Sequence, residues 1–238
     1  MVTLRSFRPS DIDSLYAISL ATGHAGGDAW HLYIDGRLMG HIYVGPYAKF
    51  SPETVLVAED DEGVGGYILG VFDTPAFEAR LEQDWWPGLR GIYPEPTGPS
   101  SGWTADERRC FMIHHLRRTP ESLTDPYPAH LHMNLLPRMQ RRGTGTALLE
   151  RWITMARKAG GKGIHVSANA ANTGALHFWP RRGFELLAPP VVPLSETTRW
   201  YGRKFEHRPL MVRGSGRHDF QATVSPKYFA IGSKLRSL

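Results

Sequence analysis

Hydrophobic and polar positions alternate with two different periods along the chain, and these periods predict both strands and helices. Residues 2–7 alternate as a half-buried strand does, and apolar side chains at helical spacing follow over residues 12–20. Residues 54–59 and 64–72 are rich in β-branched and apolar residues and flank a short acidic turn. That arrangement indicates an antiparallel hairpin.

The second half of the chain contains a strand, a basic loop with glycines and a helix in direct succession. The strand covers residues 130–136 and is stopped by Pro137, and the helix covers residues 143–158 with one apolar face. The elements expected after it are a strand at 164–167, a helix at 172–182 that Gly183 ends, a strand at 184–187, and a final strand at 197–205 pairing with it.

Length and composition predict one domain with an appended tail. The chain has 238 residues, of which 41% are hydrophobic, and this is enough to bury a sizeable core. Residues 1–205 are predicted to form the domain, with an insertion at about 75–128 that carries helices near 75–85 and 105–117. Residues 206–238 form a basic extension with six basic and two acidic side chains. These charges are scattered, which favours a solvated extension over a nucleic-acid site.

Several classes of site and location are disfavoured by what the sequence contains. Cys110 is the single cysteine, so an intramolecular disulfide is excluded and a reducing compartment is favoured. No run of apolar residues approaches the length of a signal peptide or a membrane span, and we therefore expect a cytoplasmic protein that does not enter the membrane. The acidic turn at 59–62 reads as a solvated hairpin tip, and no metal is predicted.

The loop between the strand at 130–136 and the following helix is the first candidate site. Glycines at a helix N-terminus let a phosphate approach backbone amides that lack intrahelical partners, and Arg141 and Arg142 add positive charge there. A tight strand-to-helix connection with exposed arginines is the alternative. The pattern of a P-loop is absent, and position 148 is leucine where a dinucleotide-binding loop has glycine.

Two motifs together resemble the GCN5-related N-acetyltransferase (GNAT) family. One is the spacing Gln140-x-x-Gly143-x-Gly145, and the other is Asn172-x-x-Ala175-x-x-Phe178-Trp179-x-x-x-Gly183-Phe184. Further upstream, residues 44–53 and 59–70 are similar to the acetyltransferase-like C-terminal domain of O-GlcNAcases. The resemblance covers residues 2 to 205. It implies a mixed, mostly antiparallel sheet that splays at the strand 130–136, with helices on its faces.

The resemblance also implies acetyl-CoA (CoA) as the cofactor, inserted between the strand at 130–136 and the strand at 164–167. The residues that it assigns to cofactor binding are Leu135, Leu136, Gln140, Arg141, Arg142, Gly143, Thr144, Gly145, Thr146, Asn172, Phe178 and Trp179. Trp179 stands where the family commonly has a tyrosine proposed as general acid, and tryptophan is no usable acid near neutral pH. Asn134 and Asn172 stand where the O-GlcNAcase domains carry aspartates, and an amide cannot act as a base.

Histidines on the central strand are the candidates to replace the missing base. His130, His132 and Asn134 lie on one face of the strand by parity, and a histidine there could take the proton of an amine. Packed structural histidines are the alternative. Tyr67, Asp73 and Tyr201 are weaker candidates.

These features predict an N-acetyltransferase that transfers acetyl directly to an amine of a small molecule or peptide. The candidate catalytic residues are His132, His130, Asn134 and Trp179. The alternative is a binding module or scaffold that retains acetyl-CoA without catalysis, and Trp179, Asn134 and Asn172 motivate it. A homodimer through exposed edge strands is left open.

Overall fold

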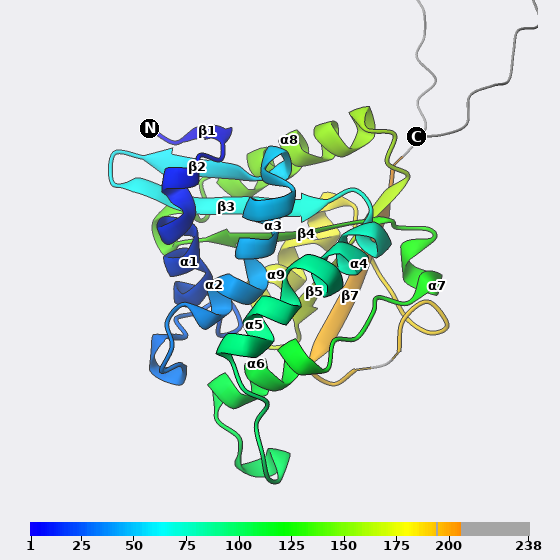
Figure 1. Ribbon diagram of the computed structural model, residues 1–238. Helices are drawn as coiled ribbons and strands as arrows, with labels where there is room; N and C mark the ends of the chain where they lie inside the picture. The colour runs from blue at the N-terminus through cyan, green and yellow to red at the C-terminus, as the bar shows by residue number, and fades with distance from the viewer. Residues whose placement is uncertain (194, 206–238) are drawn as a thin grey trace, which may run out of the picture. The chain divides into compact units, whose positions relative to one another are not determined.

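The computed structural model describes residues 1–193 and 195–205, and it contains a seven-stranded sheet in the order β1-β2-β3-β4-β5-β7-β6 (Figure 1). The basic extension predicted at 206–238 lies outside the described residues. The strands are Thr3–Ser6 (β1), Leu56–Asp60 (β2), Gly63–Val71 (β3), Ala129–Leu135 (β4), Gly163–Asn169 (β5), Glu185–Leu186 (β6) and Thr198–Lys204 (β7). All neighbouring strands are antiparallel except β4 and β5. The predicted fold class, a mixed and mostly antiparallel sheet with helices on its faces, is confirmed.

Helices cover both faces of this sheet (Figure 1). The α-helices are Ile12–Ala21 (α1), Leu38–Tyr43 (α2), Gly45–Phe50 (α3), Thr74–Asp84 (α4), Trp86–Ile92 (α5), Ala105–His114 (α6), Glu121–Thr124 (α7), Thr144–Lys158 (α8) and Thr173–Phe178 (α9). Short 3₁₀ turns occupy Pro9–Asp11, Trp30–Leu32, Pro52–Thr54, Ser100–Gly102, Pro137–Met139 and Pro180–Arg182. None of the helices in the described ranges is long and apolar enough to cross a membrane.

The period-2 alternation of the strands divides the hydrophobic core into two halves. Val57 of β2 and Leu69 of β3 face the core packed by α1 to α6, whereas Leu56 and Ile68 face the core packed by α8. Successive side chains of a strand point to opposite faces, so a strand buried on both faces is apolar throughout. This is why the hairpin at 54–72 reads as nearly continuous hydrophobic sequence.

The helix α8 was predicted from its apolar face, and the structure confirms that face. Leu148, Leu149, Trp152, Ile153 and Ala156 all have no exposed surface. They recur at the spacing of one side of an α-helix and pack on β2, β4 and β5. The N-terminus of α8 therefore sits rigidly at the end of β4, in the place where the predicted phosphate loop connects the two elements.

Two predicted helices end earlier than expected. The helix expected over 172–182 is α9 followed by a separate 3₁₀ turn, because Pro180 lacks the N–H that would continue the helix. Gly183 ends this turn with a φ of 75°, as expected. The helix expected to reach residue 117 ends at His114. The final strand β7 pairs with β6 as predicted and also pairs with β5 over seven residue pairs.

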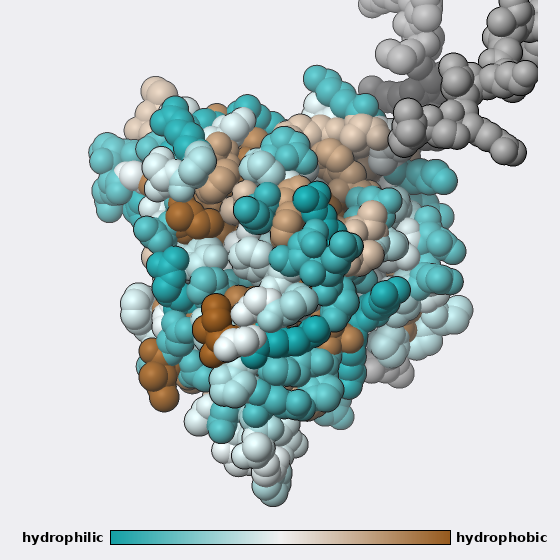
Figure 2. All heavy atoms as spheres, in the orientation of Figure 1, coloured by the Kyte–Doolittle hydropathy of each residue, from teal (hydrophilic) through white to brown (hydrophobic). Residues whose placement is uncertain are grey.

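Residues 75–128, predicted as an insertion, contribute helices to the core on one face of the sheet. Phe77, Leu81, Trp86 and Ile113 are buried there against residues of α1 to α3. On the outside of this face, apolar side chains are exposed at single positions between polar ones (Figure 2). This segment consequently shapes the space above β4 on that face.

Candidate active site

The strands β4 and β5 separate almost at once, and this separation creates the candidate site. They pair in parallel only through Ala129 with Ile164 and His130 with His165. Beyond these two pairs, β4 continues beside β3 while β5 continues beside β7. Two cavities lie along the resulting gap, and β4 borders both, with Leu131 and His132 lining one and Met133 and Asn134 lining the other.

One cavity lies beside the N-terminus of α8 and has a volume of about 930 Å³. We call it the cofactor cavity, after the role predicted for the loop that lines it. Gly143 precedes the helix with a φ of 80°, and Arg141 also has a positive φ of 59°. The first i to i−4 hydrogen bond of α8 runs from Ala147 N to the Gly143 carbonyl, at 3.0 Å. The amides of residues 144–146 precede that bond and are free of helical partners, so this end of the helix is suited to an anion.

The cofactor cavity brings together most of the residues predicted to bind the cofactor. Those that line it are Leu135, Gln140, Arg141, Gly143, Gly145, Thr146, Asn172, Phe178 and Trp179. Three predicted residues are not part of its lining. Leu136 donates its N–H to the Gly65 carbonyl at 2.8 Å and packs in the core of the opposite face, Thr144 is buried, and Arg142 is exposed beside the loop.

Sequence reasoning missed one wall of this cavity, which the loop after α1 provides. Thr22, Ala25 and Gly26 line the cavity from that side. A Cβ atom at Gly26, where φ is 91°, would lie 2.9 Å from the Asn172 Nδ2 atom, so the loop and α9 approach closely only because position 26 is glycine. The pair Gly26-Gly27 was the available signal, and it indicated no more than a loop.

Asn134 and Asn172, which the resemblance places where O-GlcNAcase domains have aspartates, both form hydrogen bonds that support the cavity walls. Asn172 caps α9, with its side-chain oxygen accepting from Ala175 N at 3.0 Å. Asn134 donates its Nδ2 to Thr22 Oγ1 at 2.6 Å, and Thr22 in turn donates to the Ile18 carbonyl at 2.7 Å. Both side chains therefore hold the walls of the cofactor cavity in place.

Trp179, at the family's usual tyrosine position, is a core residue. Only 6% of its surface is exposed, and its ring contacts those of Phe178 and Phe184 edge-on, with both centroid distances at 5.1 Å. An indole N–H is a donor without usable acidity. Trp179 thus closes the apolar end of the cofactor cavity.

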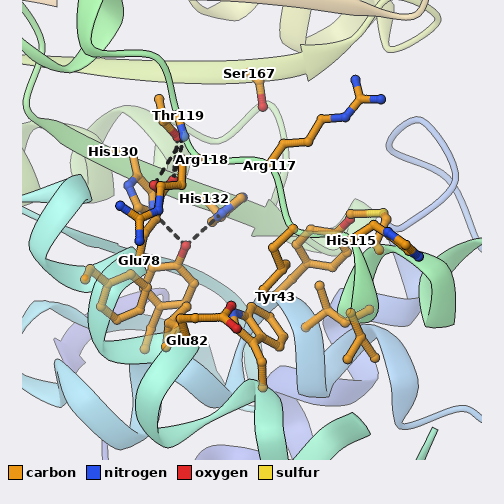
Figure 3. Close-up of a pocket in the computed structure, with 18 of the residues that line it drawn as sticks. Tyr43, Glu78, Glu82, His115, Arg117, Arg118, Thr119, His130, His132 and Ser167 are labelled. Carbon is orange, nitrogen blue, oxygen red and sulfur yellow. Dashed lines mark hydrogen bonds between the residues drawn. The ribbon is translucent and has the colours of Figure 1, made fainter. Parts of the chain in front are cut away.

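The second cavity lies at the other end of the gap, on the face covered by α2 to α6, and has a volume of about 660 Å³. We call it the acceptor cavity, after the role proposed for it below. His130 and His132 border it, together with aromatic residues of α3, α4 and β7 (Figure 3). The predicted catalytic residues are therefore divided. The two histidines line the acceptor cavity, whereas Asn134 and Trp179 line the cofactor cavity.

A chain of hydrogen bonds runs from a backbone carbonyl to His132, and Figure 3 shows the part of it that ends on His130 and His132. Thr74 Oγ1 lies 2.7 Å from the Pro128 carbonyl oxygen and 2.8 Å from His130 Nδ1. Tyr47 Oη lies 2.7 Å from His130 Nε2 and 3.1 Å from His132 Nε2. Tyr47 and Thr74 are functional residues that sequence reasoning missed, because they come from distant segments.

The Pro128 carbonyl at the end of this chain determines which group donates and which accepts in each of its hydrogen bonds. Since a carbonyl oxygen only accepts, the Thr74 hydroxyl donates to Pro128 and accepts from His130 Nδ1–H. Neutral His130 then accepts from Tyr47 at Nε2, and Tyr47 accepts from His132 Nε2–H. The network assigns His132 the Nε2–H tautomer, with an unprotonated Nδ1. No group in the described part of the chain hydrogen-bonds that Nδ1.

Burial keeps these histidines neutral. Desolvation lowers the pKa of His132 to about 4, with neighbouring His165 adding to the effect, and it lowers the pKa of His130 well below its usual range. Burial likewise lowers the pKa of His165 to about 4. The same desolvation raises the pKa of Tyr47, which therefore stays a neutral donor. No cluster of three or more metal-ligating side chains occurs in residues 1–193 and 195–205.

We expect the protein to lose stability as the pH falls from about 6.5 to about 4. In this window the unfolded chain protonates histidines that the folded chain keeps neutral, so each of His132 and His165 contributes a loss of about 3 kcal/mol. Urea unfolding at a series of pH values measures this slope. Replacing His132 by Gln should flatten it, and equal slopes in this variant and the wild type would contradict the prediction.

Comparison with known proteins agrees with this fold. A model of the acetyltransferase (GNAT) family matches residues 6–184. The chain therefore belongs to the GNAT acetyltransferase family, as the two motifs predicted.

Individual relatives resemble this chain to different degrees. The crystal structure of SsHAT is 35% identical and has a TM-score of 0.77, over 85% of this chain and 98% of that one. The structure of PH1933 from Pyrococcus horikoshii OT3, at 13% identity and a TM-score of 0.52, covers 87% of this chain and 99% of that one and shows the fold alone. Protein O-GlcNAcase of Mus musculus is 22% identical over 185 residues, or 77% of this chain. The match spans 20% of that relative's length.

Proposed function

We propose that this chain binds acetyl-CoA in the cofactor cavity and transfers the acetyl group directly to an amine in the acceptor cavity. The observation that carries the proposal is that consecutive residues of β4 line the two cavities, so that a thioester at the end of one would meet an amine in the other. Membership of the GNAT family supports the same reaction class. Direct transfer suits a site in which positioning provides much of the rate.

The residues around the N-terminus of α8 fit the pyrophosphate of acetyl-CoA. The amides of residues 144–146 offer donors, the positive end of the helix faces the cavity, and Arg141 lines it. Bound there, acetyl-CoA would supply an activated acetyl thioester. Gly145 brings the backbone close, since a Cβ atom at that position would lie 3.2 Å from Leu135 Cδ1.

His132 is the residue that would take the proton of the amine. Its Nδ1 is unprotonated in the assigned tautomer, and it borders the acceptor cavity. A histidine with a low pKa is a weak base, so it would act as the amine nitrogen attacks and its proton becomes acidic. The amine itself must arrive neutral, and we expect the rate to rise with pH through the pKa of the acceptor.

An acyl-enzyme route is disfavoured by the position of the cysteine. Cys110 lines neither cavity, and burial raises the pKa of its thiol. A thiol that stays protonated is a poor nucleophile.

A binding module without catalysis is the second candidate, and the contacts of three side chains favour it. Asn134 and Asn172 are engaged as structural supports, and Trp179 is a core residue. In this case the acetyl-CoA complex itself would be the functional state, recognised by a partner or used as a sensor.

The two candidates are separated by measuring binding and turnover on the same protein. Calorimetric titration with acetyl-CoA and CoA tests the shared step, and release of CoA thiol in the presence of a panel of small and peptidic amines tests transfer. Steady acetylation of any amine supports the enzyme and excludes the binding module. Binding with no acetylated product across the panel supports the module, and absence of binding by the folded protein contradicts both.

A further inference from the structure

The acceptor cavity has chemically distinct ends, and these ends indicate what it binds. Its volume of about 660 Å³ lies in the range of small-molecule sites. Side chains of Tyr43, Phe77 and Trp200 form apolar walls between the histidines and the mouth. Such walls suit a compact organic molecule whose polar groups sit at its two ends.

The end at β4 and β5 offers hydrogen-bond acceptors. His165 donates its Nδ1–H to the Tyr127 carbonyl at 2.7 Å, which leaves its Nε2 unprotonated in the neutral ring. His132 presents an unprotonated Nδ1 in the same cavity. Two neutral imidazole acceptors match the N–H groups of an uncharged amine.

The mouth of the cavity has a surplus of positive charge. Arg90 is held by Glu82 through two hydrogen bonds of 2.8 and 3.1 Å. Glu78 accepts from both the backbone N–H and the hydroxyl of Thr119. Arg117 and Arg118 also line the cavity, and within the described ranges neither has a carboxylate partner.

The arginines come from the segment between α6 and α7, on the opposite side of the cavity from α3. Figure 3 shows Arg118 beside His130 and Thr119, whereas the side chain of Arg117 extends away from Arg118, to the other side of Ser167 of β5. Guanidinium groups bind carboxylates through paired hydrogen bonds, so each of these two side chains offers a separate place for an anionic group. The same charges would repel a lysine-rich peptide.

We propose that the acceptor is a small amine that also carries a carboxylate or a similar anionic group, with the amine at His132 and the anion at Arg117 or Arg118. This proposal rests on the acetyl transfer proposed above, because only a transferase has an acceptor. Its test, however, is a binding measurement that needs no turnover.

The experiment compares matched pairs of compounds on the full chain saturated with CoA. The pairs are 4-aminobenzoate, 4-(aminomethyl)benzoate and 3-(4-aminophenyl)propanoate, each against its carboxamide, which has nearly the same shape but no charge. In at least one pair the carboxylate should bind about tenfold more tightly than the amide. The preference should disappear in the double variant Arg117→Gln and Arg118→Gln, while Arg108→Gln, on α6 outside the cavity lining, should retain it.

Three results would overturn the proposal. These are equal affinities within all three pairs, a preference that survives in the double Gln variant, and tighter binding of a lysine-rich peptide than of any carboxylate compound. A carboxylate preference without acetylation of any amine would uphold the anion site and instead contradict the proposed transfer. Acetylation of amines without the preference would uphold the transfer and contradict the anion site.

Discussion

Gly143→Asp is expected to weaken acetyl-CoA binding strongly while leaving the protein folded. Position 143 has a φ of 80°, and no atom lies within 4 Å of a Cβ built there. Aspartate tolerates this left-handed conformation better than most residues, and a carboxylate at a helix N-terminus stabilises the helix. The same carboxylate would repel the pyrophosphate and weaken binding by about 100-fold. Calorimetric titration and thermal unfolding measure the two effects.

Gly143→Asn is the matched control, because asparagine has the shape of aspartate without its charge. It should retain most of the affinity for acetyl-CoA, with a thermal stability close to that of the Asp variant. If the Asn and Asp variants bound equally well, the anion would not be at this helix end, and the loop would be only a structural connection. If only the Asp variant unfolded, its loss of binding would carry no information about the site, and the thermal measurement guards against that error.

His132→Gln is expected to lower kcat/KM for the acceptor by about 10² to 10⁴ with acetyl-CoA affinity unchanged. The Gln Nε2 can donate to Tyr47 Oη as His132 Nε2 does at 3.1 Å, so the packing and the hydrogen-bond chain persist. What is removed is the unprotonated Nδ1. Initial rates of CoA release at saturating acetyl-CoA measure the change, and titration with acetyl-CoA shows whether the cofactor cavity is intact.

Tyr47→Phe provides the comparison for this variant, since it keeps His132 but removes the acceptor that fixes its tautomer. We expect a smaller loss of rate and a changed pH profile, because His132 could then present either nitrogen to the cavity. Wild-type turnover by His132→Gln would rule out His132 as the base. A pH profile of Tyr47→Phe identical to that of the wild type would show that the hydrogen-bond chain does not set the tautomer.

The parts of this molecule that the sequence predicts are those determined by residues close together in the chain. The apolar face of α8, the hairpin of β2 and β3, and the turn ending at Gly183 each follow from local spacing. The glycine loop could be predicted for the same reason, since the strand, the loop and the helix follow one another directly in the sequence. Family membership was predicted from two short motifs, and the residues within each motif are likewise close together in the chain.

The acceptor side could not be predicted because it is assembled from distant segments. Tyr47 and His130 are 83 residues apart, and Thr74 and His130 are 56 residues apart. No periodicity links such positions, so strand parity placed the histidines on one face without indicating their partners. The predicted catalytic group was also treated as one set, whereas Asn134 borders a different cavity from His132.

The hydrogen-bond chain that ends on the Pro128 carbonyl makes the tautomer of His132 a property of the main chain. Every residue has a carbonyl, so a substitution at position 128 that preserves the backbone leaves the terminal acceptor in place. A change of tautomer instead requires a change at Thr74, His130 or Tyr47. Variation among related chains should therefore be tolerated at 128 and restricted at those three positions, and an engineer wishing to reverse the proton order would begin at Thr74.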